Sequence, residues 1–246
     1  MLHTDLSSYL QSQIPVLVPC FNNETYSRNM LTQLIKLGFD NIILLDNNSD
    51  DPGMKSFLHN IDGTLATVIF QGKNLGPRHC VQDADSREFL PQYFCVTDPD
   101  LEFNPALPAD WLAQMINLTE KYQVGKAGFA LDLSEPELMQ DYDIRIHDRR
   151  FKIWEWEAQY YLTQLETMRS GDPVYQAKVD TTFAVYNKKY LKFDNTEQFY
   201  TAVRVAGKYT CKHLPWYKQT GVPEAELNNY WKTGAEWASQ SQWMKK

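Results

Sequence analysis

The amino-terminal half of the chain alternates short apolar runs with segments whose apolar residues recur at helical spacing. The apolar runs, which we predict to be buried strands, are residues 14–21, 41–46, 65–70 and 93–97. The segments between them that we predict to be helices are 24–39, 54–61 and 76–90. Gly38 lies where the first of these helices should end. This β-α-β-α-β-α-β order predicts an α/β fold, with a mainly parallel, Rossmann-like sheet flanked by helices.

The carboxyl-terminal half is less regular. Its predicted elements are an amphipathic helix over 110–122, a strand over 126–134, a long aromatic helix over 151–168, a strand over 177–190 and a helical tail over 223–246. Neither an internal repeat nor a low-complexity linker marks a boundary. We therefore predict a single domain, 1–246, whose halves meet near residue 104 and which ends in a helical aromatic extension from about 221.

Composition and charge narrow the class of protein. Hydrophobic residues make up 43% of the 246, enough for a sizeable core, and the formal net charge of −7 argues against a nucleic-acid partner. No apolar run approaches the roughly 20 residues of a membrane span, and the first ten residues do not resemble a signal peptide. We expect a cytoplasmic protein with reduced, mostly buried thiols, because its cysteines are far apart and form no CxxC pair. These cysteines are Cys20, Cys80, Cys95 and Cys211.

The segment "YFCVTDPDLEF" carries the strongest chemical signal. Its apolar strand ends in Asp98 and Asp100, two residues apart on an extended chain. In open α/β sheets, ligands bind at the carboxyl ends of the strands, and two neighbouring carboxylates repel unless a cation neutralises them. Hard oxygen ligands suit Mg²⁺ or Mn²⁺. The alternative is a solvated turn in which Asp98 caps the next segment.

Four segments in order resemble glycosyltransferases of the GT-A fold, in particular those of the family 2 type. They are "VLVPCFNNETYSRNMLTQL", "IILLDNNSDDP", "GKNLGPRHC" and the D-x-D strand end, which together span residues 14–104. The chain departs from the pattern at Asn47 and Asn48, where the family has Asp-Gly. The resemblance implies that 14–104 is the nucleotide-sugar-binding half and that about 105–220 is the acceptor side.

The resemblance also implies roles for individual residues. Asp46 would accept a hydrogen bond from the imide N–H of a uracil base; its alternative is a cap on the turn that follows. Pro19 and Asn22 would line the nucleotide cleft, where a plain loop is the alternative. Asn74 and Arg78 would belong to the nucleotide-sugar site, with the Arg78 guanidinium at the ribose or pyrophosphate. A surface salt bridge is the alternative for Arg78.

The same resemblance places a divalent cation, Mn²⁺ or Mg²⁺, at Asp98 and Asp100. Asp98 would thereby also contact the nucleotide sugar. The segment "CKHLPWY" is similar to the metal-binding segment of several GT-A families, so His213 is a third candidate ligand. A purely structural histidine is the alternative.

The catalytic base is harder to identify, because the acidic pair that family 2 enzymes carry before an aromatic helix has no clean counterpart. Asp180, in "AKVDTTFAVY", is the first candidate, although aspartate is also common in turns. Glu157 is the second candidate, with Glu155 beside it, and we expect both to lie on a solvated helix face. Glu197 is a further candidate.

Taken with the resemblance, these residues predict a metal-dependent glycosyltransferase. It would move a sugar from a nucleotide sugar, foremost a UDP-sugar, to a hydroxyl of a glycan or lipid-linked acceptor, in surface glycan or capsule assembly. A nucleotidyltransferase and a non-catalytic glycan-binding protein of the same fold are the alternatives. Aromatic residues near the carboxyl end either close the core, stack on sugars or contact the inner membrane peripherally. They include Trp216, Tyr217, Tyr230, Trp231 and Trp237.

Overall fold

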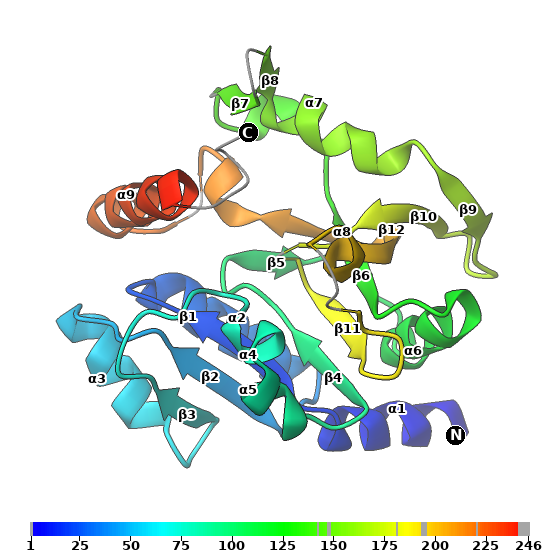
Figure 1. Cartoon of the computed structure of the whole chain (residues 1–246), viewed down its shortest axis with the longest axis horizontal. Helices are drawn as coiled ribbons and strands as arrows, with labels where there is room; N and C mark the ends of the chain where they lie inside the picture. The colour runs from blue at the N-terminus through cyan, green and yellow to red at the C-terminus, as the bar shows by residue number, and fades with distance from the viewer. Residues whose placement is uncertain are drawn as a thin grey trace.

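The computed structural model describes residues 2–141, 143–146, 149–180, 182–192, 196–219 and 221–240. Its centre is one mixed sheet with helices on both faces (Figure 1). In spatial order, the strands that the described residues contribute to the sheet are β3 (Thr67–Phe70), β2 (Ile42–Asp46), β1 (Val16–Cys20), β4 (Tyr93–Val96), β11 (Ala184–Asn187), β6 (Lys126–Leu131), β12 (Thr201–His213), β10 (Pro173–Lys178) and β9 (Gln164–Thr167), with β5 (Leu101–Phe103) paired to β12. A separate hairpin joins β7 (Asp143–Ile146) to β8 (Arg149–Lys152).

Helices cover the sheet in two layers. The α-helices are α1 (Leu2–Gln13), α2 (Glu24–Lys36), α3 (Pro52–Ile61), α4 (His79–Gln82), α5 (Ala84–Glu88), α6 (Trp111–Tyr122), α7 (Ile153–Ala158), α8 (Thr196–Tyr200) and α9 (Glu224–Gln240). Short 3₁₀ turns are η1 (Pro136–Leu138), η2 (Gln159–Tyr161) and η3 (Leu214–Trp216). Buried side chains of α2, α3 and α6 belong to one hydrophobic cluster, and those of α4 and α8 belong to a second. The α/β class predicted from the sequence is therefore confirmed.

The predicted parallel sheet is the amino-terminal half, β3-β2-β1-β4, which occupies the lower part of Figure 1. Every residue of β1 is buried, as expected of a strand with both faces covered. Its Pro19 pairs in register with Leu45 of β2, but the recorded pairing of β1 with β4 stops at Leu17. The Leu17 carbonyl faces β4. Residue 19 has the same orientation as residue 17, so an N–H at this position would point toward β4, and proline has none to donate. The two strands separate at this point, just before β4 leads into Asp98.

The carboxyl-terminal half adds antiparallel strands to the sheet. β11 runs antiparallel to both β4 and β6, and β12 runs parallel to β6. β4, β6 and β12 therefore all end at one edge of the sheet, and β11 begins there. This edge is the carboxyl edge of β1 and β2 as well. Residues from both halves of the chain meet along it.

Local sequence signals explain where two of the helices begin and end. Gly38 adopts a φ of +85° just beyond α2, a conformation that glycine reaches without strain. The Asp51 carboxylate accepts a hydrogen bond from the Met54 N–H at 2.8 Å, and Pro52 occupies the first position of α3. The end of α2 at Gly38 is the predicted one, whereas α3 begins two residues before the predicted start at residue 54.

The predicted long helix over 151–168 is wrong. Only α7 is α-helical there, and the chain continues through η2 into the edge strand β9. The Glu166 carboxylate in β9 accepts a hydrogen bond from the Tyr122 hydroxyl at 2.9 Å, and β9 pairs with β10. These tertiary contacts outweigh the helical spacing of the aromatic residues.

Three further elements differ from the predictions in length. The helix expected over 76–90 is divided into α4 and α5 at Asp83, whose carboxylate accepts from the Ser86 N–H at 2.8 Å. The strand expected over 177–190 is divided between β10 and β11. The strand expected over 126–134 ends at Leu131. All four cysteines are free and buried, as predicted.

Candidate active site

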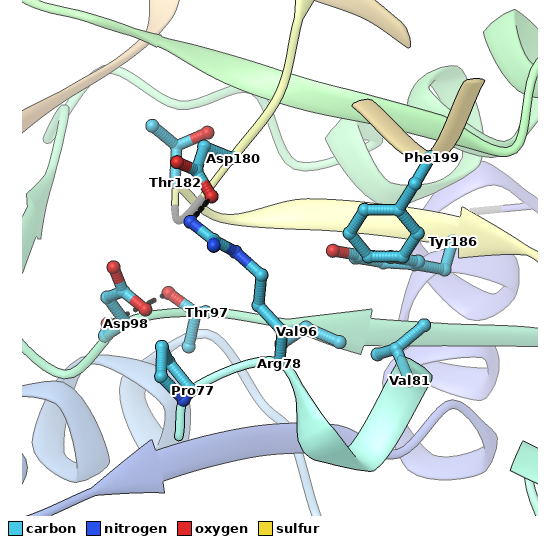
Figure 2. Close-up of a pocket in the computed structure, with 10 residues that line it drawn as sticks. All are labelled: Pro77, Arg78, Val81, Val96, Thr97, Asp98, Asp180, Thr182, Tyr186 and Phe199. Atoms are coloured by element: carbon cyan, nitrogen blue, oxygen red, sulfur yellow. Dashed lines mark hydrogen bonds and ion pairs between the residues drawn. The ribbon is translucent and has the colours of Figure 1, made fainter. Parts of the chain in front are cut away.

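The two aspartates after β4 have different partners. Asp98 is half-buried and lines a small pocket together with Arg78 and Asp180 (Figure 2). Asp100 is 4% exposed, and its Oδ2 accepts a hydrogen bond from the Tyr230 hydroxyl at 2.7 Å. Asp100 Oδ2 also lies 3.4 Å from Nε2 of His213. The structure thus brings His213 to the D-x-D segment and adds a tyrosine that sequence reasoning did not connect with it.

His213 reaches Asp100 because β5 and β12 pair antiparallel, with Leu101 opposite His213. The Asp100 carbonyl accepts from the Leu214 N–H at 2.8 Å, which fixes the turn of η3 against the D-x-D segment. The Trp216 ring packs on the imidazole at a centroid distance of 4.8 Å. The ring position of His213 is therefore determined by two strands and a neighbouring tryptophan.

Burial and charge oppose each other at this pair. Burial alone would raise the pKa of Asp100, but the adjacent His213 outweighs it and lowers that pKa below its usual value. Burial would likewise lower the pKa of His213, and the Asp100 carboxylate outweighs it and raises that pKa. Both directions favour a charged pair.

The residues fit a divalent cation in their chemistry. Two carboxylates and an imidazole are a donor set that Mn²⁺ accepts. Oδ1 of Asp100 is buried and has no hydrogen-bond partner among the residues that the structure describes, which leaves this oxygen available as a ligand. Across the described part of the chain, no group of three or more His, Cys, Asp or Glu residues is already arranged to hold a metal ion. Cation binding would therefore have to draw Asp98, Asp100 and His213 together.

Arg78 and Asp180 form an ion pair across the pocket beside Asp98 (Figure 2). Arg78 precedes α4 and is 13% exposed, whereas Asp180 lies between β10 and β11 and is 50% exposed. The guanidinium carbon also lies 5.1 Å from the centroid of the Tyr200 ring. The free space that the pocket leaves is only about 10 Å³, roughly one water molecule. The ion pair thus fills the space that a larger ligand would need.

One hydroxyl in the wall of this pocket makes no hydrogen bond to the residues that the structure describes. Thr182 is 6% exposed, and its Oγ1 has no hydrogen-bond partner among the described residues. The remaining lining is largely apolar. The residues that line the pocket are Pro77, Arg78, Val81, Val96, Thr97, Asp98, Asp180, Thr182, Tyr186 and Phe199. Sequence reasoning did not single out Thr182, although it follows Asp180 by two residues.

The residues assigned to the nucleotide lie on the first strands. Asp46 ends β2 and is 3% exposed, and its carboxylate accepts from the Ser49 N–H at 3.1 and 3.3 Å. The structure thus contains the turn contact that was the alternative for Asp46. The side-chain amide oxygen of Asn22, Oδ1, accepts from the N–H groups of Asp50 and Asp51 at 2.9 and 3.0 Å, which joins the loop after β1 to the turn after β2.

Pro19 and Asn74 complete this set. Pro19 is buried within β1. Asn74 is exposed, and its side chain accepts from the Gly76 N–H at 2.9 Å. A neighbouring contact, from the Leu75 N–H to Asn47 at 3.0 Å, joins this loop to the turn after β2. The three loops of the resemblance are therefore mutually bonded at one edge of the sheet.

Glu157 is not on a solvated helix face, so that expectation is wrong. It is 3% exposed and forms a buried ion pair with Arg204 of β12. The Arg204 Nε donates to the Lys178 carbonyl at 2.7 Å. Burial raises the pKa of Glu157, and Arg204 counteracts that rise. Glu155 is exposed as expected and accepts from the Lys152 N–H at 2.8 Å, and the Glu197 side chain lies outside the described residues.

The carboxyl-terminal aromatics differ in burial. Tyr217 is buried, whereas Trp216, Tyr230 and Trp231 are half-buried. Tyr230 stacks edge-on against Tyr26 of α2, with centroids 5.7 Å apart. The side chain of Trp237 lies outside the described residues. Among the described residues, no helix is long and apolar enough to cross a bilayer.

Comparison with known proteins shows similarity at the level of structure. No family model and no curated protein matches the sequence. The chain is similar to GalNAc-T7 crystallised with UDP, GalNAc and Mn²⁺, with 12% identity over 81% of this chain and 43% of that one, at a TM-score of 0.49. It is also similar to S. aureus TarS 1–349 in complex with UDP-GlcNAc, with 14% identity over 81% of this chain and 57% of that one, at a TM-score of 0.44.

A further similarity is to HddC from Yersinia pseudotuberculosis complexed with GMP-PN, with 9% identity over 90% of this chain and 100% of that one, at a TM-score of 0.45. The chain thus spans less than two thirds of the GalNAc-T7 and TarS chains but the whole of HddC.

Proposed function

We propose that this protein is a glycosyltransferase that moves a sugar from a nucleotide sugar, foremost a UDP-sugar, to a hydroxyl of a glycan or lipid-linked acceptor. One observation carries the proposal. Four separate segments of the chain supply side chains to the carboxyl edge of one sheet: Asp98 and Asp100 come from the segment after β4, Arg78 precedes α4, Asp180 follows β10 and His213 ends β12. Ligands of open α/β sheets bind at that edge.

Each residue then has a role that its chemistry supports. Asp98, Asp100 and His213 would hold Mn²⁺ or Mg²⁺, and the cation, when bound, supplies Lewis-acid stabilisation of the departing nucleoside diphosphate. Arg78 would bind the diphosphate, because its planar guanidinium makes paired hydrogen bonds to phosphate oxygens. Asp46 and Asn22 would lie at the base and ribose, on the β1 and β2 side of the edge.

Asp180 would accept the proton of the acceptor hydroxyl. Its carboxylate lines the same pocket as Asp98, as a base near the reacting bond must. In this structure Arg78 occupies one of its oxygens. When Arg78 turns to the phosphates of the donor, Asp180 is released to take a proton. Donor binding would thereby prepare the base.

A thermal-shift screen tests the proposal. UDP, UDP-glucose and UDP-GlcNAc, each with and without Mn²⁺, should raise the melting temperature of the full chain only when the metal is present. A ligand that binds only the folded state stabilises it by about 2.7 kcal/mol at 100 times its dissociation constant. No shift with any uridine nucleotide, together with no release of UDP, would refute the proposal.

The product released separates the proposal from its alternatives. A glycosyltransferase releases a nucleoside diphosphate, whereas a nucleotidyltransferase that forms a nucleotide sugar releases pyrophosphate. A non-catalytic glycan-binding protein releases neither. The nucleotidyltransferase usually needs a Gly-rich, basic loop directly after the first strand. Here that loop contains Asn22 and Asn23 and is bonded to the turn after β2.

A further inference from the structure

Helix α9 lies directly on the carboxylate that we assign to the cation. The Tyr230 hydroxyl donates to Asp100 Oδ2 at 2.7 Å, and the Tyr230 ring packs against Tyr26 of α2. Trp231 packs edge-on against Tyr230, with centroids 5.4 Å apart. A segment 130 positions away in sequence thus supplies a partner to Asp100.

One helical turn earlier, α9 makes a second polar contact. The Glu226 carboxylate accepts from the Thr25 N–H at 2.9 Å and from the Thr25 hydroxyl at 2.6 Å. Thr25 lies in the first turn of α2, where the free N–H groups and the helix dipole attract an anion. Positions 226 and 230 are four residues apart, so both side chains leave the same face of α9. This face therefore carries an anion for α2 and a hydrogen-bond donor for Asp100.

The hydrogen bond from Tyr230 satisfies only one of the two carboxylate oxygens of Asp100. The residue is 4% exposed, and its Oδ1 has no partner among the described residues. Nδ1 of His213 is likewise buried without a partner in the described part of the chain. A buried carboxylate oxygen without a partner is costly, so its presence marks the position of a missing ligand. Tyr230 meets the other oxygen of the same carboxylate.

We propose that residues 224–232 of α9 form a strap that holds the cation site closed, and that Tyr230 sets the affinity of the site for a divalent cation by competing for Asp100. The proposal rests on the proposed function in taking Asp100 as a cation ligand. The competition follows from charge, because a cation on the carboxylate repels the hydroxyl proton that Tyr230 directs at it. Cation binding therefore favours release of the strap, and release of the strap favours cation binding.

Titration of Mn²⁺ into the full-length protein, followed by calorimetry, tests the competition. Tyr230→Phe keeps the ring contacts and removes only the hydroxyl. It should bind Mn²⁺ about tenfold more tightly than the wild type, or better, because a hydrogen bond to a charged group is lost from the closed form. Tyr9→Phe, which changes a 62% exposed tyrosine of α1, is the matched control and should bind as the wild type does.

Protease sensitivity gives a readout of the strap itself. Lys232 lies on the exposed side of α9, so trypsin should cleave after it slowly in the metal-free protein. Addition of Mn²⁺ should accelerate that cleavage, and Glu226→Gln should accelerate it without metal. Cleavage that Mn²⁺ leaves unchanged would overturn the strap.

The outcomes separate this proposal from the proposed function. Mn²⁺ binding that Asp100→Asn abolishes, with Tyr230→Phe binding more tightly than the wild type, supports both. Asp100-dependent binding with equal affinity in Tyr230→Phe and the wild type overturns the strap alone. Binding that Asp100→Asn leaves intact, or no binding to any variant, overturns the cation site and the strap with it.

Discussion

Arg78 and Asp180, which are 102 positions apart in the sequence, form an ion pair that closes the pocket beside Asp98. Each is also a residue that we assign to the reaction, Arg78 to the diphosphate and Asp180 to the acceptor proton. The pair is partly exposed, so its own contribution to stability is small. In the proposed mechanism the pair must open for Arg78 to reach the diphosphate, and its opening releases the Asp180 oxygen that Arg78 holds.

The first prediction concerns Asp180 as the base. Asp180→Asn should lower kcat by roughly 10² to 10⁴, the usual contribution of a general base. The affinity for UDP should not fall, because the Asp180 carboxylate no longer competes with the diphosphate for Arg78. Steady-state kinetics and UDP titration measure the two effects, and Asp85→Asn, on an exposed helix, is the control. Unchanged kcat would remove Asp180 from the mechanism.

The second prediction is that Asp46 selects the nucleobase of the donor. Uracil has an N–H at its N3 position and cytosine has none, so the wild type should bind UDP more tightly than CDP. Asp46→Ala should narrow this difference by roughly 1 to 3 kcal/mol, the cost of an unmet hydrogen bond to a charged group.

The contact of Asp46 with the Ser49 N–H calls for a second variant. Asp46→Asn keeps an oxygen for that N–H and presents an amide donor, which suits the N3 acceptor of cytosine. The affinity for CDP should therefore rise relative to the affinity for UDP in this variant. Calorimetry that shows equal UDP and CDP affinities in the wild type would contradict the assignment.

Metal dependence gives the third prediction. EDTA should abolish transfer, and Mn²⁺ should restore it better than Mg²⁺, because imidazole suits Mn²⁺. His213→Ala should weaken Mn²⁺ binding by more than about tenfold, since loss of even an outer-shell partner costs that much. His59→Ala, on the exposed side of α3, is the control. Activity that persists in EDTA would show that no cation is needed.

The fourth prediction concerns Lys126, which is fully buried at the start of β6. Its Nζ donates to the Val179 carbonyl at 3.0 Å and lies 4.0 Å from the centroid of the Phe199 ring. Burial, reinforced by Arg78 and Arg204, lowers its pKa well below the ordinary value. We therefore expect Lys126 to lose its proton at a lower pH in the folded chain than in the unfolded chain, although the ring contacts favour the cation.

A lowered pKa in the folded state determines the direction in which stability changes with pH. The unfolded chain keeps the proton at Lys126 up to about pH 10.4 and the folded chain loses it at a lower pH, so the free energy of unfolding should rise with pH between the two pKa values. Lys126→Met should remove this dependence and stabilise the protein near pH 7 by about 1 to 3 kcal/mol. Urea unfolding at several pH values measures it. The exposed Lys208→Met is the control, and a pH dependence that Lys126→Met leaves unchanged would contradict the lowered pKa of Lys126.

The sequence by itself determined the parallel half of the sheet and the position of Asp98 and Asp100 at its edge. It could do so because residues 14–104 read as strands and helices from local spacing, and because parallel strands direct their carboxyl ends to one side. Gly38 likewise ends α2 through its own backbone preference. These signals need no knowledge of distant contacts.

Only the tertiary structure decided which residues share a site. Asp100 meets Tyr230 across 130 positions, and Glu157 meets Arg204 inside the core, although the spacing of its helix suggested a solvated face. Residues 164–167 read as helix but become β9, because β10 and the side chain of Tyr122 draw them into the sheet. Hydrophobic spacing reports whether a residue is covered, and it carries no information about which distant segment covers it. That choice is made by the packing of the whole chain, where pairing with a neighbouring strand or an opposite charge outweighs local preference.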